Sequence, residues 1–195
     1  MGRSLENRRL SADAPVVIAR LRSEEGFGLI ELVISMVMLN VGILAIVTAF
    51  NSGAVALRHA SEVSSAAVLA DKQMELYRAL KYTEIALDST SVTTANADTR
   101  YQCDSANKID PAVACGGANQ QTQQLTTCAT MTPQCNPRQT VAGPDQRSYR
   151  VDTYVVSQTP PSGRPVKLVT IVVRRASDLH VLARVSSSFD QSTGL

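Results

Sequence analysis

Tryptophan is absent from the 195-residue chain, and aromatic residues make up only 4% of it. Proteins that bind single-stranded nucleic acid stack bases on aromatic side chains, so a binding platform of that kind is not expected. Histidine occurs only as His59 and His180, which we interpret as surface residues. The sequence also lacks a Gly-x-Ser-x-Gly turn, a phosphate-binding glycine loop and any metal-ligand spacing. These absences predict a protein that is not an enzyme and that holds no cofactor or metal.

Charge is absent between Leu32 and Leu57, where 26 consecutive residues include no Asp, Glu, Lys or Arg. About 20 apolar residues suffice for a helix to cross the ~30 Å hydrocarbon core of a bilayer. We therefore expect one membrane-spanning helix. Five arginines precede the run, whereas Arg58 and His59 follow it. Since positively charged flanks stay in the cytoplasm, residues 1–26 are expected there and the remainder of the chain outside.

A removable secretory signal is the alternative interpretation of this segment. Ala54, Val55 and Ala56 match the small-residue pattern that signal peptidase cleaves, which would leave Leu57 as the first residue. However, the apolar stretch before that point is much longer than the roughly 7 to 15 residues of a typical signal-peptide core. A retained helix is the better interpretation.

Proline is absent between Phe27 and Tyr82, and the second half of this stretch has helical periodicity. Small and apolar residues recur there at spacings of three and four, which is typical of an amphipathic helix. The stripe consists of Ala56, Ala60, Val63, Ala67, Ala70, Met74 and Tyr77. We expect one helix from residue 27 to about residue 82, with its second half packed on a domain.

Residues 88–146 are rich in Ser, Thr, Asn, Gln and Gly and have no helical stripe, so we predict loops with at most one short strand. All four cysteines lie here: Cys103, Cys115, Cys128 and Cys135. Cysteines outside the cytoplasm tend to form disulfides, and an even number fits that expectation. Zinc is the alternative, but there is no Cys-x-x-Cys and no nearby histidine. Of the three connectivities, short loop closure favours Cys103–Cys115 with Cys128–Cys135.

Residues 147–190 show a period of two in three runs, at 148–157, 165–176 and 180–189, separated by turn residues. Three consecutive strands with short connections predict an antiparallel meander, one face of which covers the helix stripe. The predicted fold class is therefore α+β. Its long N-terminal α-helix, membrane-spanning in the first half and amphipathic in the second, packs on a small antiparallel β-sheet.

Seven Lys or Arg residues lie between residues 147 and 184, together with Asp152 and Asp178. One interpretation is a surface that faces DNA or another acidic partner. We favour the alternative that these residues occupy the outward positions of solvated strands. Nucleic acid is thus a candidate partner that no motif supports.

The most specific motif is GFGLIELVISMVMLNVGILAIV, which starts at Gly26. It resembles the N-terminal signature of type IV pilins and pseudopilins, in which a Gly, an aromatic residue and Leu-Ile-Glu precede an apolar helix. The later LNVGILAI is most similar to the PilV kind of minor pilin. The resemblance covers about 25 residues, and Gly28 departs from it because the family usually has Thr or Ser there.

The resemblance implies that a prepilin peptidase cleaves after Gly26 and methylates the new amino terminus, Phe27. It also implies that Glu31 pairs with the amino terminus of a neighbouring subunit during assembly. A carboxylate at the centre of a membrane helix costs roughly 2.5–3.5 kcal/mol, so such groups usually have a partner. The alternative for Glu31 is an interfacial carboxylate that reaches water.

These expectations divide the chain into a cytoplasmic leader peptide (1–26), a transmembrane assembly helix (27–57) and an extracytoplasmic globular domain (58–195). The expected function is a minor pilin, first a single-pass precursor in the cytoplasmic (inner) membrane and then part of a filament at the cell surface. Its expected partners are the prepilin peptidase, other pilin subunits, the assembly platform and the membrane. Two alternatives are a pseudopilin of a type II secretion or DNA-uptake machine and a signal-anchored extracytoplasmic binding domain.

Overall fold

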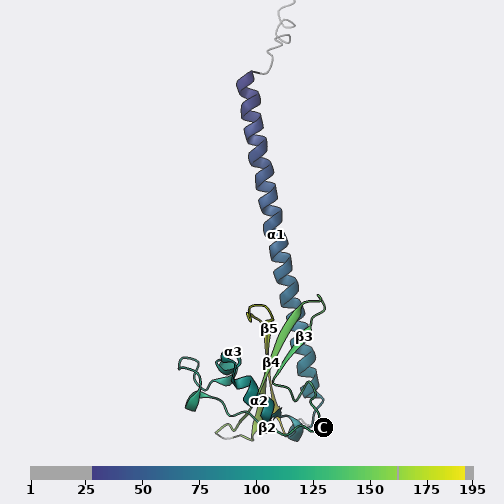
Figure 1. Cartoon of the computed structure of the whole chain (residues 1–195), viewed down its shortest axis with the longest axis vertical. Coiled ribbons are helices and arrows are strands. Elements are labelled where there is room, and N and C mark those ends of the chain that lie inside the picture. Colours follow the sequence, from purple (N-terminus) through teal and green to yellow (C-terminus); the bar gives the residue numbers. More distant parts are fainter. Residues whose placement is uncertain (1–27, 162, 192–195) are drawn as a thin grey trace, which may run out of the picture. The chain divides into compact units, whose positions relative to one another are not determined.

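A computed structural model describes residues 28–161 and 163–191 and has the α+β architecture that the sequence predicts (Figure 1). A long helix, α1 (Leu29–Arg78), precedes several short helices and two β-sheets. The chain divides into two compact units, Met1–Ser52 and Gly53–Leu195. The first unit contributes the start of α1, and the second contains the rest of α1 together with both sheets.

The helix α1 contains no proline, and its many Leu, Ala and Met residues have high helix propensity. Its first turn is closed by the Glu31 amide, which donates to the Gly28 carbonyl at 2.9 Å. It ends at Arg78, where a cation interacts favourably with the C-terminal end of the helix dipole. Lys81 then has an extended backbone, so the helix stops short of the predicted end near Tyr82.

One face of α1 is buried within the second unit. The buried residues are Glu62, Ser65, Ala66, Leu69, Ala70, Gln73, Met74 and Tyr77. The predicted stripe is confirmed at Ala70, Met74 and Tyr77 but is wrong at Ala56, Ala60 and Val63, which are exposed. The periodicity continues through both regions, but burial of α1 starts more than one turn after Ala56.

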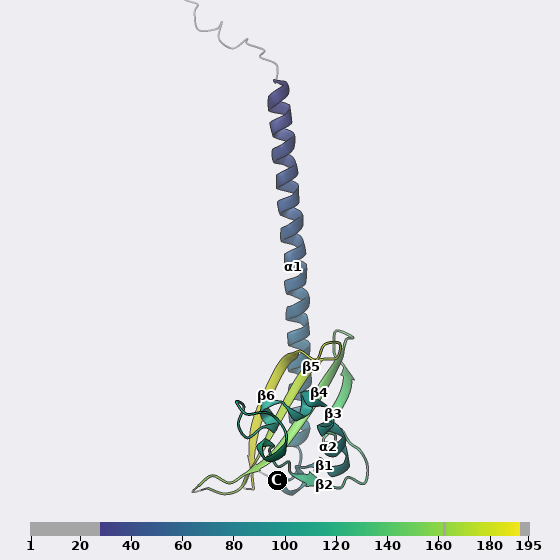
Figure 2. The same cartoon turned by 60° about the vertical axis from the view of Figure 1, so that its left-hand side comes forward.

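Four antiparallel strands form the main sheet in the order β3-β4-β5-β6 (Figure 2). They are β3 (Arg138–Ala142), β4 (Ser148–Gln158), β5 (Val166–Arg175) and β6 (Val181–Asp190). The last three confirm the predicted meander. The edge strand β3 adds a fourth member, and its sequence RQTVA lacks the apolar alternation that identifies the others.

The region 88–146 is more regular than predicted. It contains α2 (Ser89–Asn96), α3 (Thr99–Gln102) and two 3-10 turns (Ser105–Asn107 and Gly117–Asn119). A further 3-10 turn, Tyr82–Glu84, lies just before the region. The short strand β1 (Leu87–Asp88) pairs in parallel with β2 (Leu125–Thr126). The expectation of loops is wrong for α2. Asp88 caps this helix by accepting the Ser91 amide at 2.9 Å, and only Val92 and Ala95 are buried. A helix of Ser, Thr and Asn that buries two residues shows no periodic stripe.

The main sheet is covered on both faces, because successive side chains of a strand point to opposite sides. On one face, α1 packs against Tyr149, Val151, Val155, Val169, Ile171 and Val173. On the other face, Tyr101 of α3 stacks on Tyr154 with ring centroids 4.5 Å apart. Charged residues of the strands that point to this second face are therefore enclosed by α2 and α3.

Candidate functional site

Glu31 lies in the first turn of α1 and is exposed. From Leu32 to Leu57 the helix has no charged residue, and all of these side chains are exposed as well. Within the described part of the chain, α1 is the one helix long and apolar enough to cross a membrane, and its most apolar 18-residue window has a mean hydropathy of 2.4. Such a helix near the N-terminus is compatible with a membrane anchor. The predicted cleavage residues Gly26 and Phe27 lie outside the described residues.

The exposed apolar side chains of α1 need a partner that the described chain does not supply. Burying a Val, Leu, Ile, Phe or Met side chain is worth about 1.5–3 kcal/mol relative to leaving it in water. The segment between Leu29 and Leu57 exposes many such side chains, among them Leu29, Met36, Leu44 and Phe50. The length and apolar surface of this segment are compatible with a lipid bilayer.

The four cysteines form two disulfides, Cys103–Cys115 and Cys128–Cys135, and none is free. The pairing favoured by loop length is confirmed. Because every sulfur is used, the cysteines are not zinc ligands. The described residues also contain no group of three or more His, Cys, Asp or Glu side chains arranged to hold a metal.

The second disulfide closes a loop that is fastened to α1. Gln73 donates to the Pro133 carbonyl at 2.9 Å, and the Tyr77 hydroxyl donates to the Gln134 carbonyl at 2.6 Å. The same loop exchanges hydrogen bonds with Asp88, whose amide donates to Cys135 at 2.9 Å. The disulfide therefore stabilises the contact between the helix and the polar region of the domain.

The basic residues of 147–184 follow the predicted outward, solvated positions only in part: Arg147, Arg164 and Arg184 are exposed. Arg150 and Lys167 are 6% exposed and Arg174 is 5% exposed, so the assignment to outward, solvated positions is wrong for these three. Arg147, Arg175 and Arg184 instead pair with carboxylates of the same chain. This pairing reduces the positive charge that the region offers to an acidic partner.

Seven of the charged residues form one network on the second face of the sheet, which we name the arginine–aspartate cluster. Its members are Asp98, Asp104, Arg138, Arg150, Asp152, Arg174 and Arg184. Asp152 lies at its centre and is fully buried. The Asp152 carboxylate accepts hydrogen bonds from Arg150 Nε at 2.8 Å and Arg174 Nε at 3.0 Å.

Two more members of the cluster, Asp98 and Asp104, come from the region of α3. Asp98 accepts Arg150 Nη1 at 2.6 Å, and its nearest oxygen lies 3.4 Å from Arg138 Nη2. Asp104 pairs with Arg174 and accepts Arg184 Nη2 at 2.8 Å. Burial alone would raise the pKa of Asp98, but the hydrogen bond from the Arg100 amide and the pairing with Arg150 outweigh it and hold the pKa below its ordinary value.

Strand register brings the cluster together. Arg138 is opposite Asp152, which is opposite Val172, which in turn is opposite Arg184. Sequence analysis missed the cluster although a signal was present. The alternation in SYRVDTYVVS places Arg150 and Asp152 on one face of β4, and charges on the buried face of a strand are expected to be paired.

A second ion-pair site holds the start of the buried part of α1. Glu62 is 6% exposed and pairs with Arg147, and its other oxygen accepts Arg175 Nη2 at 2.6 Å. The stripe seen in the sequence does not include Glu62, so the helical periodicity does not predict its burial. Arg147 directly precedes β4 and Arg175 is the last residue of β5, and helical periodicity cannot predict that either residue lies beside α1.

Lys167 fastens the segment that follows α1. Its ammonium group donates to the Tyr82 carbonyl at 2.6 Å and the Ile85 carbonyl at 2.8 Å, and it lies 4.7 Å from the centre of the Tyr82 ring. Burial lowers the pKa of Lys167, because removal from water disfavours the charged form. Its hydrogen bonds assign it a structural role.

The two histidines are exposed, as expected: His59 on α1 and His180 beside the turn before β6. Neither lies within the arginine–aspartate cluster or the Glu62 site. The candidate functional site is therefore the exposed apolar segment of α1 with Glu31 at its start. Comparison with protein-family models, curated proteins and solved structures gives no match.

Proposed function

We propose that the protein is a structural subunit, a minor pilin of a type IV pilus-like filament, that assembles through the first half of α1. The observation that carries this proposal is the placement of Glu31. It is a lone carboxylate in the first turn of an exposed helix that has no other charge through Leu57. The Gly26–Phe27 junction directly before it supports the proposal from the sequence.

The precursor is a single-pass protein of the cytoplasmic membrane. The uncharged segment from Leu32 to Leu57 spans the bilayer, with residues 1–26 in the cytoplasm and the globular domain outside. The two disulfides support this orientation, since disulfides persist in oxidising compartments and are rare in the cytoplasm.

Processing creates the partner that Glu31 needs. Hydrolysis of the bond after Gly26 by a prepilin peptidase releases the leader and frees the α-amine of Phe27, which stays basic after N-methylation. A carboxylate inside a membrane is stabilised by a nearby cation, and the processed amino terminus of a neighbouring subunit supplies one. The pair fixes the position of one helix relative to the next.

Assembly then covers the apolar surface of α1. Within lipid there is no hydrophobic force between helices, so helix association depends on packing and on polar contacts. Each Glu31 pair supplies such a polar contact, whereas the side chains from Leu32 onward supply the packing.

The experiment compares Glu31→Ala with Asp71→Ala in cells that contain a prepilin peptidase. Asp71 is an exposed carboxylate on the same helix beyond the apolar segment, which makes it a matched control. We expect Glu31→Ala to be inserted and cleaved normally, while its recovery in sheared filaments falls by tenfold or more, as loss of a charge pair worth about 3 kcal/mol requires. Asp71→Ala should be recovered at the wild-type level.

Two further arms separate the alternatives. Gly26→Ala should accumulate the uncleaved precursor, and the wild-type mature chain should start with N-methyl-Phe27 by intact mass. Equal recovery of Glu31→Ala and wild type in filaments would show that Glu31 is only an interfacial carboxylate. A mature chain that starts at Leu57 would instead assign the protein to the secretory signal pathway.

A further inference from the structure

The arginine–aspartate cluster has more positive than negative groups. It contains four guanidinium groups, from Arg138, Arg150, Arg174 and Arg184, and three carboxylates, from Asp98, Asp104 and Asp152. The cluster therefore carries one net positive charge, and four of its members, Asp104, Arg150, Asp152 and Arg174, are buried. Buried charge is unfavourable unless it is paired, so a further negative group would complete the cluster.

Two guanidinium nitrogens in the cluster lack an acceptor. Arg150 donates through Nε and Nη1, but its Nη2 is buried without a hydrogen-bond partner. Arg138 donates through Nη2 to the Ala95 carbonyl at 2.6 Å, but its Nε is also buried without a partner. The Asp152 oxygen that pairs with Arg138 Nε is 3.8 Å away, too far for a hydrogen bond.

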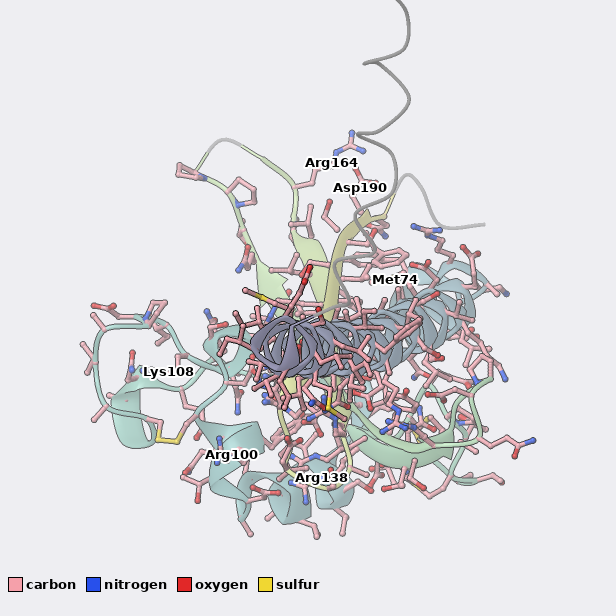
Figure 3. The ribbon with its side chains drawn as sticks, turned by 90° about the horizontal axis from the view of Figure 1, so that it is seen from above. Met74, Arg100, Lys108, Arg138, Arg164 and Asp190 are labelled. Carbon is pink, nitrogen blue, oxygen red and sulfur yellow. A yellow bond between two sulfur atoms is a disulfide. The ribbon has the colours of Figure 1, made fainter. Side chains whose placement is uncertain are left out.

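Arg138 also connects the cluster with the surface. Its guanidinium carbon lies 5.7 Å from the centre of the Tyr101 ring, and its side chain is 28% exposed. Figure 3 shows Arg138 and Arg100 on one side of the second unit, opposite Arg164 and Asp190. The exposed part of Arg138 forms one wall of a surface pocket.

That pocket has a volume of about 220 Å³ and is lined by Thr90, Ser91, Thr94, Ala95, Asn136 and Arg138. The Thr90 hydroxyl, the Asn136 amide and the Arg138 guanidinium group can donate hydrogen bonds into it. The other two hydroxyls already donate within the chain, Ser91 to Asp88 at 2.8 Å and Thr94 to the Thr90 carbonyl at 3.1 Å. No carboxylate lines it. Pockets for drug-sized ligands measure roughly 300–1,000 Å³, so this one suits an ion or group of only a few heavy atoms.

We propose that this pocket binds a small oxyanion, such as phosphate or the carboxylate group of a small acid, with Arg138 as its charged contact. Arg138 pairs with the ligand, and the hydroxyl of Thr90 and the amide of Asn136 supply further hydrogen bonds. The bound anion offsets the excess positive charge of the cluster. Guanidinium groups suit this role because their planar N–H groups match carboxylate and phosphate oxygens. The site is independent of filament assembly, since it lies within the second unit.

The test is isothermal titration of the full chain in neutral detergent with sodium phosphate, and in a second arm with sodium acetate. Sodium chloride at equal ionic strength is the reference for nonspecific salt effects. We expect saturable binding at one site per chain in at least one arm. The phosphate and acetate arms distinguish a tetrahedral anion from a carboxylate as the preferred ligand.

Three variants assign the binding to the pocket. Arg138→Gln should weaken it by about tenfold or more, as the loss of a charge-assisted hydrogen bond predicts. Thr90→Val should weaken it several-fold, and because Thr90 is exposed this variant keeps the fold. Arg147→Gln, which removes an arginine that pairs with Glu62 outside the cluster, should bind like the wild type.

The outcomes are distinct even if Arg138→Gln does not fold. Saturable binding that Thr90→Val weakens and Arg147→Gln leaves unchanged supports the site. Absence of saturable heat in both arms, or equal heat from chloride, means that the pocket has no preference for an oxyanion and overturns the proposal. Equal weakening by Thr90→Val and Arg147→Gln also overturns it, since the anion would then bind elsewhere.

Discussion

The two units of the chain differ in which side chains they bury: the described part of the first exposes its apolar residues, whereas the second buries apolar residues and several charged ones. In the first unit, every described side chain is exposed, most are apolar, and Glu31 is the one charged residue among residues 28–52. In the second unit, Asp152, Arg150 and Arg174 are buried and paired with one another, while apolar residues form the core. The first unit therefore depends on its surroundings, whereas the second supplies its own partners.

This difference explains why the two units carry different kinds of information about function. In the first unit the apolar side chains are exposed, and contact with lipid or with other apolar helices would remove them from water. The second unit has a covered sheet and buried ion pairs, so the feature that points to a binding role is the set of buried guanidinium nitrogens without a hydrogen-bond partner. The proposed assembly function and the proposed anion site follow these two routes.

The largest expected effect tests whether the second unit depends on its buried pairs. In Asp152→Ala, the guanidinium groups of Arg150 and Arg174 lose a fully buried partner. Removing one member of a buried ion pair costs about 3–5 kcal/mol, because the other charge stays buried and unpaired. We expect this loss in the free energy of unfolding, measured by guanidinium chloride titration of the purified protein.

Asp178→Ala is the matched control for this substitution. Asp178 pairs with Arg175 at the surface, where ion pairs contribute little because water screens them. Its unfolding midpoint should equal that of the wild type. If Asp152→Ala is as stable as Asp178→Ala, the buried ion pairs contribute no more to the stability of the second unit than a surface pair does.

The second prediction concerns the two disulfides, which sharpen the comparison because both lie in the second unit. A disulfide that closes a short loop stabilises a protein by about 3 kcal/mol. Replacing Cys128 and Cys135 with serine should cost more than replacing Cys103 and Cys115, since Gln73 and Tyr77 of α1 bond to the loop that Cys128–Cys135 closes. The two double variants are compared by denaturant unfolding. Equal losses would show that the contact between that loop and α1 contributes nothing beyond loop closure.

Some of this architecture could be predicted from the sequence because it follows from local patterns. Strands β4, β5 and β6 alternate with period two, and the disulfide pairing follows from short loop closure. The helix α1 follows from the absence of proline and the apolar run. These elements were confirmed because each is determined by residues close together in the chain.

The remainder depends on contacts between distant segments. Glu62 is buried where Arg147 and Arg175 pair with it, and the helix pattern alone does not predict that burial. The helix α2 has no apolar stripe, so its sequence does not predict it even though Asp88 caps its first turn. The cleavage residue Gly26 and the pairing role of Glu31 stay predictions, because a single copy of the chain contains neither the peptidase nor the neighbouring subunit.

The third prediction uses acid as a graded test of the second unit. The Ser91 amide and hydroxyl bond to Asp88 and hold its pKa below the ordinary value, and the pKa of Asp98 is lowered as well. A carboxyl group with a lowered pKa contributes stability above its unfolded pKa of about 3.9, and this stability is lost as pH falls through the lower folded value. The thermal midpoint should therefore be flat between pH 7 and pH 5 and fall below about pH 4.

Asp88→Asn provides the control for the acid titration. The amide oxygen can still cap α2, but the group no longer titrates, so the decline below pH 4 should be shallower than in the wild type. An identical decline in Asp88→Asn and wild type would assign the acid sensitivity to other carboxylates.

The smallest expected effect is that of removing the first unit. Every described residue before Glu62 is exposed, so a chain that starts at Gly53 loses no buried contact within the second unit. Its free energy of unfolding should lie within about 0.5 kcal/mol of the full chain, apart from fraying of the first exposed turns of the helix, as is usual for surface changes. The shortened chain should also stay in solution without detergent, because most of the exposed apolar side chains have been removed. Thermal unfolding followed by circular dichroism, with and without detergent, measures both. A large loss of stability would show that the second unit needs the first unit in order to fold.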